Sequence, residues 1–332
     1  MKNLYILVGI PGSGKSTWAN EFHAIHKNSV ILESDNIRKD IFGDLKHQSR
    51  SNHAQVFQVM EKQLIDNMKQ GIENIIYDAT NIKRKNRKNL YIIGKKYGYN
   101  VSILIFSISY KKALTINNNR DILKRVPEYK IMEMYKTMQI PKIGLDCDTY
   151  TFETSDIINI NEEIIGADFN KSHNSPYHKE SILEHISMCV ANTKKLHIEY
   201  DNFNDLHTIA LYHDIGKSFC RIKNNDISPR VVWYREKFGE YDRFDNHEYV
   251  SSMYYLSLVT PEKFVVATNN IIAESIFHHM QAHRGISEKY INKHNITEDE
   301  LTLISQFARI DSMSKIVDKE MLEKFQNIKN KL

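Results

Sequence analysis

A glycine-rich segment near the start of the chain, GIPGSGKST at residues 9–17, has the residue types and spacing of a phosphate-binding loop. Glycines let backbone N–H groups wrap an anionic phosphate, and the dipole of a following helix adds to the attraction. In the pattern GxxxxGK[ST], the lysine reaches the outer phosphates and the serine hydroxyl binds Mg²⁺. The predicted nucleoside triphosphate site comprises Gly9, Gly12, Ser13, Gly14, Lys15, Ser16 and Thr17, with Ser16 as the Mg²⁺ ligand.

A carboxylate and an arginine three residues apart follow the next apolar run, in the segment ESDNIRKD. The carboxylate of Asp35 can accept the proton of an attacking hydroxyl group, and Arg38, one helical turn later, can hold a phosphate on the acceptor. The alternative is a helix N-cap aspartate followed by a solvent-exposed arginine. The pair favours phosphoryl transfer onto a hydroxyl only in combination with the phosphate loop.

Two later segments add polar residues at expected strand ends and loops. IIYDATN places Asp78, Thr80 and Asn81 at the end of an apolar run, where an acid faces the phosphates and the water shell of the metal, or where turn chemistry alone explains the residues. NNNRDILKRVPE carries Arg120 and Arg125 before a proline-started helix. A basic lid at this point would offset the charge on a transferred phosphoryl group, whereas the alternative is a solvated charged loop.

Together, GIPGSGKST, SDNIR, DATN and the arginine-bearing lid resemble the polynucleotide kinase family of P-loop phosphotransferases over roughly residues 1–155. The resemblance implies ATP and Mg²⁺ as cofactors. It also implies Asp35 as the general base on a 5′-hydroxyl, Arg38 on the neighbouring 3′-phosphate, and Arg120 on the donor phosphates, with Lys15 as the fourth catalytic residue.

The lid departs from the pattern of that family, which carries two arginines earlier in the loop. This chain has Ile116 and Asn117 there. Arg125 is the alternative second contact.

The second half of the chain contains a His–Asp doublet, His213 and Asp214, in the segment LYHDIGKSF. Such a doublet places two metal ligands side by side, and imidazoles with carboxylates suit a first-row transition metal or magnesium. Two close metal ions could clamp a phosphate and generate a hydroxide nucleophile. The further candidate ligands are His185, His247, His278, His279 and Asp311.

The pattern H…HDIGK…NHE…HH…D resembles the HD-domain metal-dependent phosphohydrolases over about residues 173–320. The resemblance implies an all-helical fold and a divalent transition metal such as Mn²⁺, with two ions expected. Lys217 is implied as a contact to substrate phosphate, with charge pairing at a helix C-terminus as the alternative. The implied ligands are His185, His213, Asp214 and Asp311 for the first ion, and His247 with His279 (His278 remaining open) for the second.

The elements that must position these residues differ between the two halves. Strand-like runs at 4–8, 30–32, 75–77 and 101–106 alternate with helical patterns at 52–69, 85–97 and 127–138, which favours a parallel α/β sheet with helices on both faces. Helical patterns at 181–197, 203–213, 247–258, 268–283 and 298–311 favour an all-α second domain. We expect a P-loop kinase domain at 1–160 and an HD domain at 170–332.

Two short segments invite other interpretations. KRKNRK at residues 83–88 could follow a nucleic-acid backbone, although such a run is more often the solvent-exposed face of a helix. LDCDTY, ending at Tyr150, superficially matches the DxDxT nucleophile segment of haloacid-dehalogenase phosphatases. The helical, histidine-rich chain that follows leaves no room for that domain, so the segment is predicted to be the last strand and turn of the kinase.

Composition limits the possible settings. The chain has 332 residues, 41% hydrophobic and 26% charged, which is typical of globular proteins with two domains. Its three cysteines form no CxxC pair, and no apolar run is long enough to span a membrane, so we expect a reducing cytoplasm. The net charge of +4 permits a nucleic-acid partner without arguing for one.

The two motif sets together predict a bifunctional nucleic-acid end-healing enzyme. A 5′-hydroxyl kinase would act beside a 3′-phosphatase or 2′,3′-cyclic phosphate hydrolase, on RNA or DNA ends that a ligase then joins. The alternatives are a small-metabolite or nucleoside kinase fused to an HD nucleotide phosphohydrolase, and a non-catalytic ATP-gated module.

Overall fold

The computed structural model describes residues 1–45, 49–155, 168–175, 177–196, 201–222, 232–233, 235–236, 242–259, 267–317 and 319. The chain divides into two compact units. The first comprises Met1–Ile160 with Ser257–Val266, and the second comprises Asn161–Leu256 with Ala267–Leu332. Within the described residues, no helix has the length and apolarity needed to cross a membrane.

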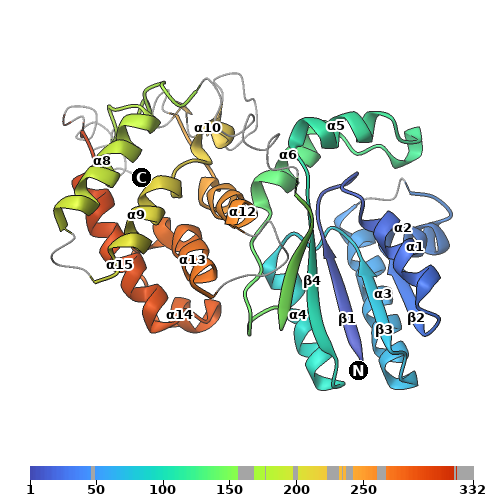
Figure 1. The fold of residues 1–332 in the computed structure, drawn as a ribbon. Coiled ribbons are helices and arrows are strands. Elements are labelled where there is room, and N and C mark those ends of the chain that lie inside the picture. Colours follow the sequence, from blue (N-terminus) through green and yellow to red (C-terminus); the bar gives the residue numbers. More distant parts are fainter. Residues whose placement is uncertain are drawn as a thin grey trace. The chain divides into compact units, whose positions relative to one another are not determined.

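The first unit contains a five-stranded parallel sheet with the strand order β2-β3-β1-β4-β5 (Figure 1). The four predicted strands are confirmed, each one or two residues longer than its apolar run, and a fifth strand follows them. The strands are β1 Asn3–Val8, β2 Ser29–Glu33, β3 Asn74–Asp78, β4 Asn100–Ser107 and β5 Thr149–Ser155.

Helices cover both faces of this sheet. Successive side chains of β1 point to opposite sides, and those on both sides are apolar and buried. Leu7 packs in one apolar cluster with Ala19 of α1 (Lys15–Ile25), to which Tyr5 also belongs. Leu4, on the other face, lies under Gly94 of α4 (Arg84–Lys96). A Cβ atom on Gly94 would come within 2.6 Å of Val101 Cγ2, so the glycine lets α4 approach the sheet closely.

Among the described residues, the first unit has further helices, of which α3 and α6 confirm predicted periodic segments. α3 spans the predicted 52–69 segment, and a Ser49 side chain caps its N-terminus by accepting from the Asn52 N–H. α6 starts directly after Pro127, as expected for proline at a helix start. These helices are α2 Ser34–Phe42, α3 Arg50–Gln70, α5 Tyr110–Asn118, the short 3₁₀ helix η1 Ile122–Lys124, and α6 Glu128–Thr137.

In the second unit, every regular element longer than an isolated bridge within the described residues is a helix. All five predicted helical segments are present, and α13 packs against α15 and α9. Thr297 and Glu300 form a reciprocal capping box at the start of α15. The helices are α8 Ile182–Leu196, α9 Phe203–Tyr212, α10 Lys217–Cys220, α12 His247–Val259 (in this unit up to Leu256), α13 Ala267–Ala282, α14 Glu288–His294 and α15 Glu298–Met313.

The LDCDTY segment is confirmed as a turn leading into the last strand, since β5 begins at Thr149. Its two carboxylates are used structurally. Asp146 is fully buried and pairs with Arg87, while Asp148 accepts from Lys95 Nζ at 2.9 Å and from the Val101 N–H at 2.8 Å. Neither aspartate is placed as a free nucleophile.

The basic run at residues 83–88 is not a uniformly exposed helix face, and that interpretation is wrong for two of its residues. Arg84 and Arg87 are 5% and 0% exposed. Arg84 donates to the Ile140 carbonyl, and Arg87 donates to Asp146 and to the carbonyls of Asn81, Gln139 and Ile140. Both arginines therefore fasten α4 to the segment that precedes β5.

Candidate functional site

The phosphate loop connects β1 to α1 and has the backbone that its glycines permit. Gly12 and Gly14 have φ of 83° and 97°, in the left-handed region that favours glycine. A Cβ atom on Gly9 would lie 2.7 Å from the Phe106 carbonyl oxygen, so no larger residue fits there. Residues 11–17, which include the end of the loop and the start of α1, line one cavity.

Two side chains of this loop carry the polar chemistry. Lys15 Nζ donates to the Ile10 carbonyl at 2.9 Å and to Ser13 Oγ at 3.2 Å, so the ammonium lies within the curve of the loop. Burial of Lys15, partly offset by Asp78, lowers the pKa of its ammonium to about 8. Ser16 Oγ donates to Asp78 Oδ2 at 2.6 Å. Burial raises the pKa of Asp78, and the Ser16 hydrogen bond opposes that rise.

A cavity of about 390 Å³ lies over the loop and brings the predicted kinase residues together. Asp35, Arg38 and Arg120 all line it, although they come from the start of α2 and from the segment after α5. Asp78 and Thr80, after β3, line the same cavity. Residues far apart in sequence therefore surround one space at the carboxyl ends of the parallel strands, where such sheets bind ligands.

Asp35 and Arg38 are held as a pair at one wall of this cavity. Arg38 Nη1 lies 3.3 Å from Asp35 Oδ1, and Nη2 lies 3.0 Å from His53 Nδ1 of α3. Arg38 is 4% exposed, whereas the Asp35 side chain is 45% exposed. The carboxylate thus faces the open space while the guanidinium is fixed behind it. Burial, and next Arg38, lowers the pKa of His53, which favours the neutral ring as an acceptor.

The basic residues that face the cavity from the lid differ from the predicted pair, Arg120 and Arg125. Arg120 lines the cavity, and so does Lys124, which sequence reasoning did not single out. The Arg125 Nε donates to the Arg120 carbonyl at 3.0 Å, and this exposed side chain is not among those lining the cavity. Asn117 is buried, and its side chain donates to the Val126 carbonyl and accepts from the Val126 N–H. It therefore closes the lid loop instead of facing a phosphate.

Asn81 has a structural position. It adopts a positive φ of 45°, and its amide donates to the Leu7 carbonyl at 2.8 Å, which ties the end of β3 to β1. The turn interpretation therefore explains this residue, whereas Asp78 and Thr80 face the cavity.

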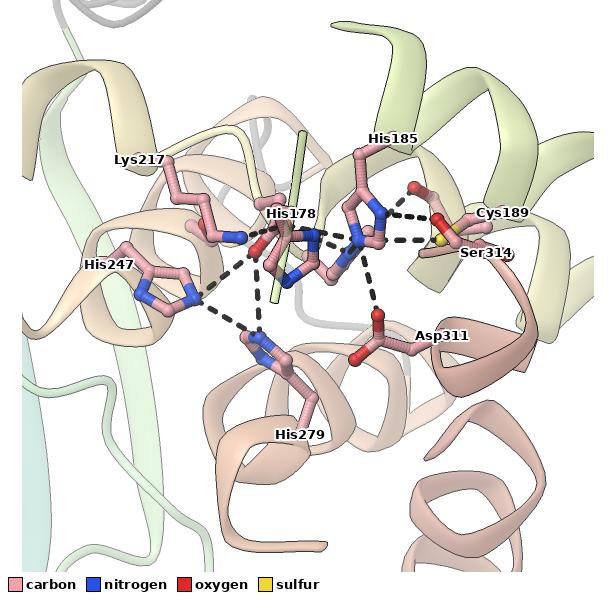
Figure 2. Close-up of polar contacts among 12 residues, drawn as sticks. His178, His185, Cys189, Lys217, His247, His279, Asp311 and Ser314 are labelled. Carbon is pink, nitrogen blue, oxygen red and sulfur yellow. Dashed lines mark hydrogen bonds and ion pairs between the residues drawn. The ribbon is translucent and has the colours of Figure 1, made fainter. Parts of the chain in front are cut away.

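In the second unit, Asp214 joins two groups of imidazoles. Its Oδ2 lies 3.3 Å from His213 Nε2 and 3.4 Å from His185 Nε2. Its Oδ1 lies 3.1 Å from His247 Nε2 and 3.7 Å from His279 Nε2. Figure 2 shows His185, His247, His279 and Asp311 directed toward a common centre, and all the imidazoles are buried. One carboxylate oxygen therefore serves each group.

The hydrogen bonds on the far side of each ring fix which nitrogen faces the centre. The Nδ1 atoms of His185, His213, His247 and His279 contact the carbonyls of Ser314, Ala210, Phe244 and Ile276 at 2.7–3.0 Å. Because a carbonyl only accepts, each Nδ1 carries a proton, and each Nε2, once deprotonated, presents a lone pair to the centre of the cluster. This is the arrangement that orients metal-binding imidazoles.

The facing lone pairs require a positive charge between them. His213 Nε2 lies 3.3 Å from His185 Nε2, and His247 Nε2 lies 3.2 Å from His279 Nε2. Burial alone lowers the pKa of His185, but Asp311, at 3.1 Å, and other acceptors raise it to about 12. Asp214 Oδ2 and Asp311 Oδ1 are buried without a well-aligned hydrogen-bond donor among the described residues. The imidazole nitrogens and carboxylate oxygens of this cluster are ligands that suit divalent cations.

Of the two adjacent histidines, the structure brings His279 to the cluster. His278 points elsewhere: its Nδ1 lies 2.8 Å from the Tyr290 hydroxyl and its Nε2 lies 3.4 Å from Glu274. Lys217 Nζ lies 2.6 Å from Asp214 Oδ2 and 3.1 Å from His173 Nε2. Lys217 therefore reaches the edge of the cluster, already paired with Asp214.

Several residues beside this cluster were missed from sequence. His178 Nδ1 donates to Glu180 at 2.7 Å, and Glu180 also faces His185 Nδ1 at 3.4 Å. Cys189 Sγ lies 3.7 Å from His185 Nε2. The four-residue spacing of His185 and Cys189 on α8 was the available signal, since it places both on one helix face.

One comparison with known proteins is located on the unit that contains the phosphate loop. A family model described as an AAA domain matches residues 4–141. The chain is similar over 103 residues to the 2′,3′-cyclic-nucleotide 3′-phosphodiesterases of Rattus norvegicus, at 29% identity, and Mus musculus, at 28% identity. These matches cover 31% of this chain and 23% of each relative, so the chain spans less than a quarter of the length of the curated relatives it matches.

Solved structures with partial similarity include one titled as the Pnkp1/Rnl/Hen1 RNA repair complex, at 27% identity and a TM-score of 0.37. That alignment covers 40% of this chain and 42% of the other. Both this score and its coverage are low, so the strand order described above, and not this similarity, defines the fold.

Proposed function

We propose that this chain is a bifunctional nucleic-acid end-healing enzyme. Its first unit would phosphorylate a 5′-hydroxyl end using ATP and Mg²⁺, and its second unit, as an HD-type phosphohydrolase, would remove a 3′-phosphate or a 2′,3′-cyclic phosphate. The observation that carries the kinase proposal is the single cavity in which Lys15, Asp35, Arg38 and Arg120 meet over the phosphate loop.

The residues of that cavity suit an in-line transfer from nucleotide to hydroxyl. The loop N–H groups and Lys15 would bind the β- and γ-phosphates, and Ser16 would bind Mg²⁺, with Asp78 accepting from its hydroxyl or from a metal-bound water. Asp35, the more exposed member of its pair, would accept the proton of the 5′-hydroxyl. Arg120 would offset the charge that develops on the transferred group.

Arg38 has two roles in this proposal. Its guanidinium would hold the phosphate next to the acceptor hydroxyl, and its present contact orients the Asp35 carboxylate. A phosphate-bearing acceptor is thereby favoured over a free nucleoside, which has no group for Arg38 to bind. Competition between a 5′-hydroxyl oligonucleotide and a free nucleoside for the labelled phosphate tests this preference.

The kinase proposal is tested with γ-labelled ATP and a 5′-hydroxyl oligonucleotide. Lys15→Ala and Asp35→Asn should each lower the turnover by at least about 10²-fold, since each removes a contact made to the reacting groups. Asp40→Asn is the matched control, because Asp40 is exposed on the same helix, α2, and does not line the cavity. Normal labelling by either cavity variant would overturn the proposal.

The second activity is supported by the fit of the buried cluster to divalent cations. His185, His213, Asp214 and Asp311 would hold one ion, and Asp214, His247 and His279 would hold the other. When bound, such ions supply charge stabilisation and an acidic water for hydrolysis of a phosphoester. The chain's own contribution is to fix each Nε2 through a backbone carbonyl and to hold Lys217 at the edge of the cluster, toward substrate phosphate.

The pairing of these activities supports the choice of substrate. A strand end with a 5′-hydroxyl and a 2′,3′-cyclic phosphate needs both a phosphate added and a phosphate removed before a ligase can seal it. Relatives of part of this chain are named for phosphodiester chemistry on 2′,3′-cyclic nucleotides, which agrees with that substrate class. A nucleic-acid ligase is therefore the class of enzyme that would consume the product.

A further inference from the structure

The side chain of Cys189 lies among the atoms that would hold the first metal ion. It is fully buried on α8, one helical turn after His185, and its thiol joins His185, His213 and Asp311 in a group whose ligand atoms all lie within 4.8 Å of one another. None of the other described cysteines belongs to such a group, since Cys147 and Cys220 are buried outside the three clusters of possible ligands.

The distances within this group match those between ligands of one ion. In a tetrahedral zinc site, bond lengths of about 2.0 Å to nitrogen and about 2.3 Å to sulfur separate two nitrogens by about 3.3 Å and a nitrogen from a sulfur by about 3.5 Å. The observed separations are 3.3 Å for His185 and His213 Nε2, and 3.7 Å for Cys189 Sγ and His185 Nε2. His185 Nε2 and Asp311 Oδ1 lie 3.1 Å apart.

The neighbouring group offers a different donor set. Asp214 Oδ1, His247 and His279 provide nitrogen and oxygen only, and they include no thiol. A thiolate favours zinc-like ions over magnesium or manganese, whereas imidazole with carboxylate accepts a wider range. The two groups therefore differ in the ions that they should retain.

We propose that Cys189 is a thiolate ligand of the first metal ion and makes that position selective for a zinc-like cation. The inference rests on the metal centre proposed above. Binding would deprotonate the thiol and release its proton to solvent. With His185, His213 and Asp311, the thiolate would give the first ion four ligands from one group, beside the shared Asp214 carboxylate, so this ion would be held firmly. The second group, with three protein ligands, would keep positions open for water and substrate.

Cobalt provides the test, because Co²⁺ bound by a thiolate gives a strong sulfur-to-metal charge-transfer absorption in the near ultraviolet. The full-length protein is stripped with a chelator, and two equivalents of Co²⁺ are added so that both groups are filled. We expect the band in the unmodified protein and in Cys220→Ser, and its loss in Cys189→Ser. We also expect Cys189→Ser to retain Zn²⁺ at least about 10-fold less tightly in competition with a chelating dye, as loss of a ligand requires.

The outcomes separate this inference from the metal centre itself. Bound Co²⁺ in the unmodified protein, confirmed by elemental analysis, without a charge-transfer band would overturn the role of Cys189 and leave the metal centre intact. Failure of the unmodified protein to bind any divalent ion would overturn both. The decisive spectrum comes from the unmodified protein, so it does not depend on the folding of a variant, and circular dichroism checks that Cys189→Ser keeps its helices.

Discussion

At the scale of single residues, the positions of Lys124 and Arg125 indicate which basic side chain of the lid can contact a phosphate. Lys124 lines the cavity and lowers the pKa of Glu33, against the rise that burial causes, while Arg125 bonds the Arg120 carbonyl outside the lining. We therefore expect Lys124→Ala to raise the KM for ATP by about fivefold, since an exposed charge contributes on the order of 1 kcal/mol. Arg125→Ala should change KM less than about threefold. Steady-state kinetics with varied ATP measures both, and the reverse order would show that Arg125 is the lid contact.

Lys15 predicts a pH-dependent uptake of protons when nucleotide binds. Its pKa is lowered to about 8 mainly by burial, so at pH 8.5 only about a quarter of the free protein carries this proton. Phosphate binding raises the pKa again, and the complex should take up about 0.7 proton at pH 8.5 but less than about 0.1 at pH 7. Titration calorimetry of a non-hydrolysable ATP analogue in buffers of different ionisation enthalpy measures this uptake.

The control for this prediction is Lys15→Arg. Arginine stays protonated throughout this pH range, so the variant should show no rise in uptake between pH 7 and 8.5. An equal rise in both proteins would place the titrating group elsewhere.

Sequence predicted the residues that belong to short motifs and missed those that depend on the fold. Lys15, Asp35 and His213 could be proposed from sequence because their neighbours in sequence define their chemistry. Lys124 could not be separated from Arg125, because only the turn that follows η1 decides which of them faces the cavity. Cys189 was missed because its thiol acquires a role only when α8 packs beside α9 and α15.

At the scale of elements, strands and helices were predictable because their apolar residues repeat with clear periods. The burial of Arg84 and Arg87 in the basic run of α4 was not predictable. An arginine is buried only where several acceptors converge, and those of Arg87 come from the carbonyls of Asn81, Gln139 and Ile140 together with the Asp146 carboxylate. No local pattern reports acceptors that lie more than fifty residues away in sequence.

The buried pair of Arg87 and Asp146 gives a stability prediction for this element. Arg87→Met should lower the free energy of unfolding by about 3–5 kcal/mol, because it leaves Asp146 buried without its partner. Adding Asp146→Asn should recover part of the loss. Lys85→Met, on the exposed face of the same helix, should change stability by less than about 0.5 kcal/mol. Urea unfolding of the four proteins measures these values, and equal effects of the two methionine substitutions would contradict the structural role of Arg87.

At the scale of the whole molecule, each proposed site is built entirely from side chains of one unit. The cavity over the phosphate loop uses residues of Met1–Ile160, and the histidine and aspartate cluster uses residues of the second unit. Among the described residues, the two sites share no side chain, so the two chemical activities should be separable by substitution.

The measurement uses one RNA oligonucleotide with a 5′-hydroxyl and a 2′,3′-cyclic phosphate, and both ends are resolved after incubation with ATP. Lys15→Ala should lose 5′ phosphorylation and keep processing of the 3′ end. Asp214→Ala should do the reverse, because removing the carboxylate shared by both imidazole groups dismantles the metal centre. After chelation, Mg²⁺ alone should restore the 5′ reaction, whereas the 3′ reaction should require a transition metal. Loss of both reactions in either single variant would show that the sites are coupled, since neither substitution removes a side chain from the other site.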